Sequence, residues 1–162
     1  MSTHFAAVLA RTSKGWIGRE VDMTAIADLD ELADEMRDVA GGGTAVLFLE
    51  EDDEYLAIVR VDGDKDPRTF ISDDRAVGTS ALAELVMQDI VPPEPVDEDD
   101  DDEGIKPEPE AVGDTEIVAD LGISSAALLD LCAEEGYLPS DMMTAICEKA
   151  GCVDVLEEVR GT

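Results

Sequence analysis

The first 90 residues alternate between hydrophobic patterns of period two and patterns of helical period. Strand patterns occupy residues 4–11, 16–21, 44–50, 55–62 and 68–72. One helical pattern lies at 24–40, and another follows the fifth strand up to residue 90. Short links between successive strands favour hairpins and therefore an antiparallel sheet. The order ββαβββα predicts an α+β domain, a five-stranded antiparallel sheet with both helices on one face.

Capping residues mark the ends of these two helices. Thr24 is the expected N-cap of the first helix, and Gly41 opens the run of three glycines that ends it. The second helix has two candidate caps, Asp73 and Ser80, and the sequence leaves the choice between them open.

The last part of the chain, residues 117–162, shows only helical patterns. Short helices are predicted at 117–121, 125–135, 139–150 and 153–159. About 45 residues is close to the lower limit for independent folding. Two arrangements therefore remain open, a small helical domain of marginal stability or a helical unit that packs on the sheet domain.

A proline-rich acidic segment separates the two parts. Residues 91–116 hold 12 acids, one base and five of the seven prolines. Its centre is an unbroken acidic run, formed by Asp97, Glu98, Asp99, Asp100, Asp101, Asp102 and Glu103. Such a sequence buries little and repels itself, so it predicts an extended disordered linker. The expected division is a sheet domain at 1–91, a linker at 92–116 and a small helical domain at 117–162.

Composition limits the class of protein. Aromatic residues are only 4% of the chain, so the core must be aliphatic, and the strands at 46–49 and 56–59 are apolar at every position, as at the centre of a sheet. No apolar run approaches the roughly 20 residues that span a bilayer. The N-terminus shows no secretory pattern, and three cysteines in no recognised spacing favour reduced thiols. We expect a cytoplasmic protein.

Net charge limits the class of partner. The chain holds 41 Asp and Glu against 11 Lys and Arg, a formal net charge of −30. Such a protein is repelled by nucleic-acid phosphates and by anionic lipids, so we expect neither direct nucleic-acid binding nor membrane binding. Basic proteins and cations are the complementary partners, although high charge also serves solubility alone.

Catalytic and metal-binding patterns are missing from the sequence. The only histidine is His4, and no nucleophile elbow, zinc-protease motif or phosphate loop is present. The cysteines, Cys132, Cys147 and Cys152, have no metal-ligand spacing and fall mainly on apolar helix faces. We therefore expect no enzyme activity and no cofactor. An enzyme that uses carboxylates alone remains an alternative.

One acidic spacing resembles a calcium loop. Asp62, Asp64 and Asp66 copy the first three ligand positions, and Asp73 falls at the twelfth. Pro67 stands where the loop needs glycine for a sharp turn, and strands rather than helices flank it. The sequence therefore predicts no calcium site.

Surface positions that could hold a partner are few. Trp16 could anchor a partner or cover the sheet, and both interpretations stay open. Met142 and Met143 are the other apolar candidates. The acidic run Asp97–Glu103 is the electrostatic candidate.

Several motifs in their order resemble a known family. They are Phe5-Ala6-Ala7-Val8 followed by Trp16, the strand at 55–61, Ile71-Ser72-Asp73, the acidic stretch at 96–103, and the helical segments at 117–122 and 138–146. The chain resembles the actinobacterial tRNA adenosine deaminase-associated proteins over nearly its full length. None of these motifs is catalytic, so the resemblance supplies a context and no site residues.

The resemblance implies association with a tRNA adenosine deaminase, not the deaminase reaction. A zinc deaminase needs a His-x-Glu motif and a Pro-Cys-x-x-Cys motif. Here Phe5 and Ala6 follow His4, and no cysteine pair fits. We expect a non-catalytic partner or regulator of the deaminase. The alternative is a general acidic adaptor unrelated to tRNA modification.

Overall fold

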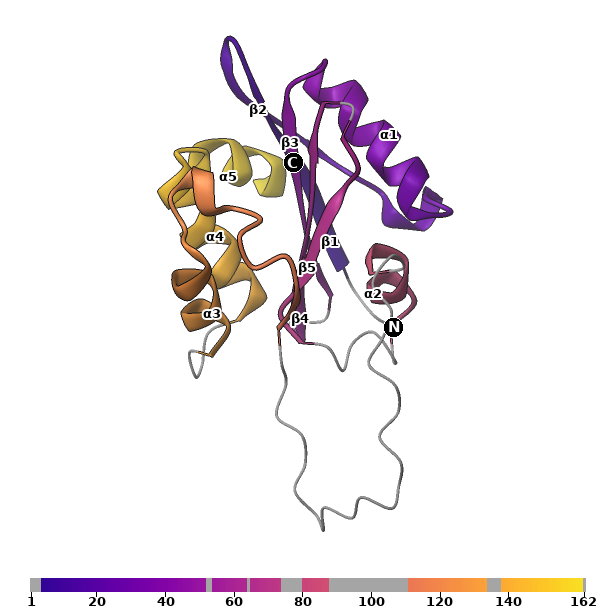
Figure 1. Cartoon of the computed structure of the whole chain (residues 1–162). Coiled ribbons are helices and arrows are strands. Elements are labelled where there is room, and N and C mark those ends of the chain that lie inside the picture. The colour runs from indigo at the N-terminus through magenta and orange to yellow at the C-terminus, as the bar shows by residue number, and fades with distance from the viewer. Residues whose placement is uncertain are drawn as a thin grey trace.

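An antiparallel sheet lies at the centre of the molecule (Figure 1). The structure is a computed structural model that describes residues 4–51, 54–63, 65–73, 80–87, 111–133 and 138–161. The strands are β1 (His4–Thr12), β2 (Gly15–Glu20), β3 (Thr44–Glu51), β4 (Tyr55–Asp62), β5 (Arg68–Ile71) and β6 (Val112–Gly113). They lie in the order β2-β1-β3-β4-β5-β6. The five strands predicted from the hydrophobic pattern are confirmed, as is the α+β class.

One face of the sheet carries the two helices that the first 90 residues predict. They are α1 (Leu29–Ala40) and α2 (Ala81–Val86), and a short 3-10 helix, η1 (Met23–Ala25), precedes α1. Alternate residues of β1, β3 and β4 point to this face because side chains alternate along a strand. The buried core here includes Ala6, Val8, Leu32, Met36, Leu47, Leu49, Val59, Ala83 and Val86. The expectation that both helices share one face is confirmed.

The start of α1 differs from the prediction that Thr24 caps it. Asp28 is the N-cap, because its carboxylate accepts a hydrogen bond of 2.8 Å from the Glu31 N–H. The Glu31 carboxylate accepts one in return from the Ala27 N–H, at 2.9 Å. Thr24 lies instead in η1, where its hydroxyl donates to Asp22. Two reciprocal bonds close the helix start better than one threonine can.

The start of α2 settles the choice left open between Asp73 and Ser80. Ser80 is the cap, since its hydroxyl accepts a hydrogen bond of 3.2 Å from the Ala83 N–H. The hydrophobic pattern also allowed a longer helix, from after Asp73 up to residue 90. Both ends of that helix, at 74–79 and 88–90, lie outside the described residues.

The C-terminal helices cover the opposite face of the sheet (Figure 1). They are η3 (Ala119–Leu121), α3 (Ser125–Ala133), α4 (Pro139–Ala150) and α5 (Val153–Gly161). A second buried core joins them to the strands and includes Leu9, Val46, Phe48, Ile58, Phe70, Leu128, Met143, Ile146 and Leu156. In the structure the helical unit therefore packs on the sheet, which lies between two helical layers.

Strand β6 comes from the end of the segment that we expected to be linker. Val112 pairs with Ile71, and Gly113 pairs with Phe70. The Asp114 N–H extends this contact with a hydrogen bond of 2.8 Å to the Thr69 carbonyl. Gly113 has a φ of 108°, and a Cβ there would lie 2.4 Å from the Thr69 carbonyl oxygen, so glycine is required. Residues 88–110, the greater part of the expected linker, lie outside the described residues.

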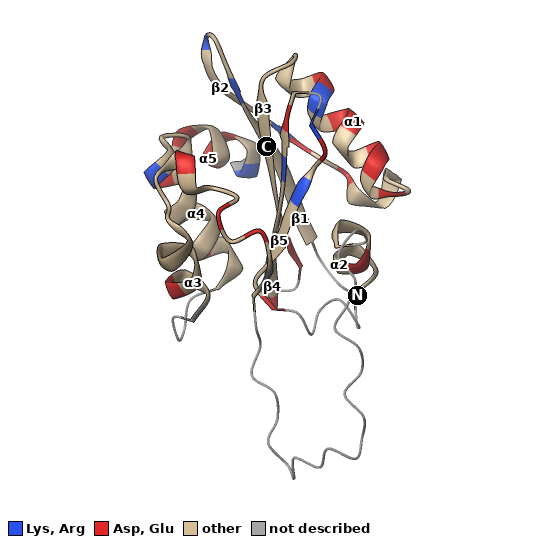
Figure 2. Cartoon of the chain, in the orientation of Figure 1, with Lys and Arg blue, Asp and Glu red and all other residues tan. Residues whose placement is uncertain are grey.

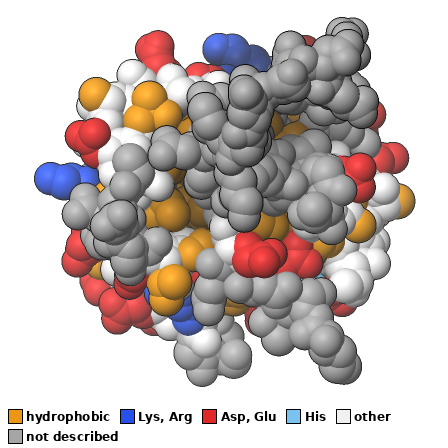
Figure 3. Space-filling view, turned by 90° about the horizontal axis from the view of Figure 1, so that it is seen from below, with side chains coloured by type: hydrophobic (Ala, Val, Ile, Leu, Met, Phe, Trp, Pro, Cys, Tyr) orange, Lys and Arg blue, Asp and Glu red, His pale blue; other side chains and the backbone are white. Residues whose placement is uncertain are grey.

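Acidic residues lie on both helical layers (Figure 2). Helix α1 alone carries Asp30, Glu31, Asp34, Glu35 and Asp38. From below, acidic side chains also lie around much of the outline of the molecule (Figure 3). In the described part of the chain, no helix has the length and apolar character needed to cross a membrane.

Candidate protein-interaction surface

Strand β2 forms one edge of the sheet, and β1 is the only described strand that pairs with it. The register places Trp16 opposite Arg11 and Glu20 opposite Ala7. Side chains therefore alternate along β2, and Trp16, Gly18 and Glu20 face the layer that contains α5. Most of the strand is exposed.

Helix α5 crosses β2 at Gly18, the point of closest approach. A Cβ at this position would lie 2.7 Å from Cγ1 of Val155 and 2.8 Å from Cγ2 of Val159. It would also lie 2.8 Å from Cδ2 of Leu9. Real Cβ atoms do not approach heavy atoms so closely, so any side chain here would push α5 off the strand. Glycine thus sets the spacing between β2 and α5.

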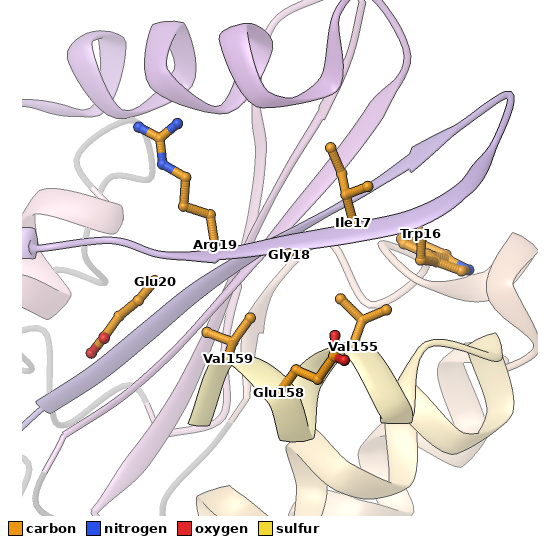
Figure 4. Close-up of a pocket in the computed structure, with 8 residues that line it drawn as sticks. All are labelled: Trp16, Ile17, Gly18, Arg19, Glu20, Val155, Glu158 and Val159. Atoms are coloured by element: carbon orange, nitrogen blue, oxygen red, sulfur yellow. The ribbon is translucent and has the colours of Figure 1, made fainter. Parts of the chain in front are cut away.

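A surface hollow lies beside this crossing (Figure 4). It has a volume of about 410 Å³. Its lining is Trp16, Ile17, Gly18, Arg19, Glu20, Val155, Glu158 and Val159. The wall is thus partly apolar, from Trp16 and the two valines, and partly acidic, from Glu20 and Glu158.

Among the described residues, the arginines near the hollow form ion pairs, whereas the two glutamates of the hollow do not. Arg19 pairs with Glu35 on α1, at 3.7 Å. Arg11 lies over the Trp16 ring at 5.8 Å and approaches Asp120 at 3.9 Å. Within the described residues, neither Glu20 nor Glu158 has an ion pair. Unpaired carboxylates beside apolar surface favour a ligand that carries both apolar groups and positive charge.

A second polar cluster lies where the chain returns to the sheet after β6. The side chain of Arg60, on β4, is only 4% exposed. Its guanidinium donates to both carboxylate oxygens of Asp120, to the Ile117 carbonyl at 2.9 Å and to Asp62 at 3.1 Å. These bonds from Arg60 lower the pKa of the Asp120 carboxyl. Arg60 therefore holds the segment around η3 against the sheet, a structural role.

This attachment has a second ion pair beside it. Arg68, on β5, pairs with Asp114 at 3.1 Å and with Asp62 at 3.4 Å. Asp62 also accepts a hydrogen bond of 2.9 Å from the Thr44 hydroxyl. Asp62, the first acid of the calcium-like spacing, is thus paired with Arg60 and Arg68, and Asp64 lies outside the described residues. In the described parts of the chain, no group of three His, Cys, Asp or Glu could hold a metal ion.

The three cysteines lie in or against the second core. Cys147 and Cys152 are buried at the end of α4, and Cys132 is partly buried. The Cys147 carbonyl accepts hydrogen bonds from the N–H groups of Gly151 and Cys152, both at 2.9 Å. Cys147 and Cys152 therefore stand at the two positions that usually make a hydrophobic contact at the end of a helix. Burial raises the pKa of Cys132 to about 11, which makes a reactive thiolate rare at neutral pH.

The structure separates the residues that the sequence suggested for partner binding. Trp16 is half-buried at the edge hollow, so it both covers the sheet and reaches the surface. Met142 and Met143 are 6% and 0% exposed, because both pack into the second core. They are therefore not surface anchors in this structure. The acidic run Asp97–Glu103 lies outside the described residues.

Sequence reasoning missed Gly18 and Glu158. A glycine within a strand pattern signals close approach of another backbone or helix, so Gly18 carried a usable signal. Glu158 carried none, because it is one of many acids on short helices. Only the packing of α5 on β2 brings it to the hollow.

The comparisons with known proteins agree with the resemblance seen in the motifs. Searches of curated proteins and of solved structures found no match to the chain. A family model, described as Rv3753c-like tRNA adenosine deaminase-associated protein, matches residues 4–153. The match covers the sheet and the C-terminal helices up to the first residue of α5, so the chain belongs to the tRNA adenosine deaminase-associated protein family.

Proposed function

We propose that this protein is a non-catalytic partner of a tRNA adenosine deaminase and regulates or positions that enzyme in the cytoplasm. The observation that carries the proposal is the family match over residues 4–153, since the family is described as associated with the deaminase. The chemistry of the chain agrees with this role. Its sequence lacks the deaminase zinc motifs, and its polar clusters serve caps and ion pairs.

Charge supplies a physical reason for the two proteins to meet. An enzyme that binds tRNA must present positive surface to the phosphates. A chain of net charge −30 is attracted to such a surface within about one Debye length, roughly 8 Å at physiological salt. The acidic run Asp97–Glu103 concentrates this charge. Attraction of this kind speeds encounter more than it holds a complex, so holding needs directional contacts elsewhere.

Mixing the purified chain with the purified deaminase of the same organism tests the proposal. Size-exclusion chromatography at low salt should show a complex, and added tRNA should displace the chain. No complex at low salt would contradict the proposal and favour a general adaptor.

The acidic run has a matched control. Replacing Asp97–Glu103 with Ser and Gly should slow association at least about tenfold in stopped flow, because steering charge is lost. Exchanging each Asp for Glu and each Glu for Asp keeps the charge and should leave the rate within about twofold. Equal rates for the two variants would refute electrostatic steering by this run.

The non-catalytic part of the proposal has its own test. The purified chain alone should not deaminate adenosine in a tRNA anticodon, and elemental analysis should find no stoichiometric zinc. One zinc per chain after dialysis against a chelator would contradict it.

A further inference from the structure

The ladder between β1 and β2 fixes which backbone groups face the free edge. The Val21 N–H donates to the Ala6 carbonyl, at 2.9 Å, so this opposed pair is hydrogen-bonded. Antiparallel pairs alternate between hydrogen-bonded and non-bonded types. Counting back along the register makes Glu20, Gly18 and Trp16 members of non-bonded pairs. Their N–H and C=O groups therefore point away from β1, toward the open edge.

The same three positions face the hollow, and two of them, Trp16 and Glu20, carry side chains. Trp16 supplies an aromatic wall and Glu20 a carboxylate, while Gly18 leaves room for the two valines of α5 (Figure 4). Glu158 adds a second carboxylate from α5. Backbone donors and acceptors thus lie beside an apolar and acidic hollow, the combination that strand addition uses for affinity and specificity.

We propose that β2 docks an extended segment of a protein partner, which adds a strand to the sheet edge. On the face that meets the hollow, the segment would carry an apolar and a basic side chain two positions apart, because residues i and i+2 of a strand share a face. On the hollow side, an apolar group would contact Trp16 and the α5 valines, and a Lys or Arg would reach Glu20 and Glu158. The assignment of this segment to the deaminase rests on the proposed function. The assignment of β2 as a docking edge does not depend on that function.

Charge excludes the other occupants of this edge. A second copy of the chain would bring another net charge of −30, and its own β2 would bring a second Glu20 to the same edge. Nucleic acid would bring phosphates to the same carboxylates. A basic, extended protein segment is the occupant that removes charge from this surface.

A proline at the edge tests the backbone contacts. Glu20→Pro removes one outward N–H at the exposed end of the strand, where proline is tolerated, and leaves the bonds to β1 intact. Glu20→Gln removes only the charge. By calorimetric titration with the purified deaminase, we expect Glu20→Pro to weaken binding at least about tenfold and Glu20→Gln two- to threefold. Equal effects of the two variants would overturn strand addition.

The acidic wall has a matched pair on one helix. Glu158→Lys inverts a charge in the hollow, and Glu157→Lys makes the same change at an exposed neighbour that does not line it. We expect at least about a fivefold loss of deaminase affinity for the first and less than twofold for the second. Similar losses would mean that only net charge matters and would overturn the assignment of the hollow.

Amide signals separate this inference from the proposed function. The synthetic peptide Thr-Val-Thr-Arg-Thr-Val, which places Val and Arg on one face of a strand, should shift the NMR amide signals of Trp16, Gly18 and Glu20, whereas Thr-Val-Thr-Glu-Thr-Val should not. If the deaminase does not bind, these shifts alone decide whether the edge docks a strand. Unchanged signals with the basic peptide, or a dimer of the chain that Glu20→Pro abolishes, would overturn the inference. Deaminase binding without slower amide exchange at these residues would leave the proposed function standing and remove the docking site.

Discussion

Removing the carboxylate of Asp120 should destabilise the protein more than its exposure suggests. The Asp120 side chain is 52% exposed, yet it accepts two hydrogen bonds from Arg60, whose side chain is 4% exposed. Asp120→Ala leaves the buried guanidinium with Asp62 and the Ile117 carbonyl only. A buried cation that loses a partner is the costly side of a broken ion pair.

The expected magnitude follows from the burial of the two partners. Breaking a fully buried pair costs about 3–5 kcal/mol, and an exposed pair contributes about 0–1 kcal/mol. This pair has one buried and one half-exposed member, so we expect Asp120→Ala to cost about 2 kcal/mol. Arg60→Met should cost about 1.5 kcal/mol, because it leaves carboxylates that water can reach and keeps an apolar stem. The double variant should also cost about 1.5 kcal/mol, which gives a coupling energy of about 2 kcal/mol.

Urea unfolding of the four proteins measures this coupling. The fluorescence of Trp16, the only tryptophan, reports the contact between β2 and α5. Asp130→Ala is the control, since Asp130 is exposed on α3 with no described ion pair, and its effect should stay within about 0.5 kcal/mol. Additive effects of the Arg60 and Asp120 substitutions would refute the proposed attachment of the η3 segment to the sheet.

Three further predictions concern other parts of the fold. Gly18→Ala should destabilise the protein by about 1–2 kcal/mol in urea unfolding, because its Cβ would overlap Val155 and Val159. Adding Val155→Ala should recover part of this loss, and no effect of Gly18→Ala would contradict the close approach of α5 to β2. The folded-state pKa of Asp120 is lowered, so its contribution is present above its ordinary pKa of 3.8 and is lost as the pH falls through the folded value. The stability difference between wild type and Asp120→Asn should therefore shrink on acidification below about pH 4, and a constant difference would argue against the ion pair. In timed alkylation at pH 7.5 followed by mass spectrometry, Cys132 should react slowly, but before the buried Cys147 and Cys152. Earlier labelling of either buried thiol would contradict the packing of α4.

The hydrophobic pattern predicted the strands because each strand buries alternate or continuous apolar positions. It also contained a signal for the second helical layer. Strands β3 and β4 are apolar on both faces, from Val46 to Leu49 and from Leu56 to Val59, and each face needs a cover. The two helices of the first 90 residues cover one face only. The pattern left open whether the C-terminal helices form this cover, and the structure shows that they do.

Other features depend on contacts that no local pattern contains. Strand β6 has two residues, and its place beside β5 follows from pairing with Phe70 and Ile71 after a long excursion of the chain. The hollow arises only where α5 crosses β2, so residues more than 130 positions apart form one surface. Met142 and Met143 were expected at the surface and are buried, because an apolar pair on a short helix fits a surface anchor and a core position equally well. Only the packing on the sheet decides between the two.

Calorimetric titration of the purified chain into the purified tRNA adenosine deaminase of the same organism measures the proposed partnership itself. We predict binding at low salt whose association constant falls steeply as salt rises from about 50 to 300 mM, because opposite charges bring the proteins together. We also predict that tRNA competes with the chain. Absence of binding at about 50 mM salt, or binding that is indifferent to both salt and tRNA, would contradict a charge-steered partnership with the deaminase.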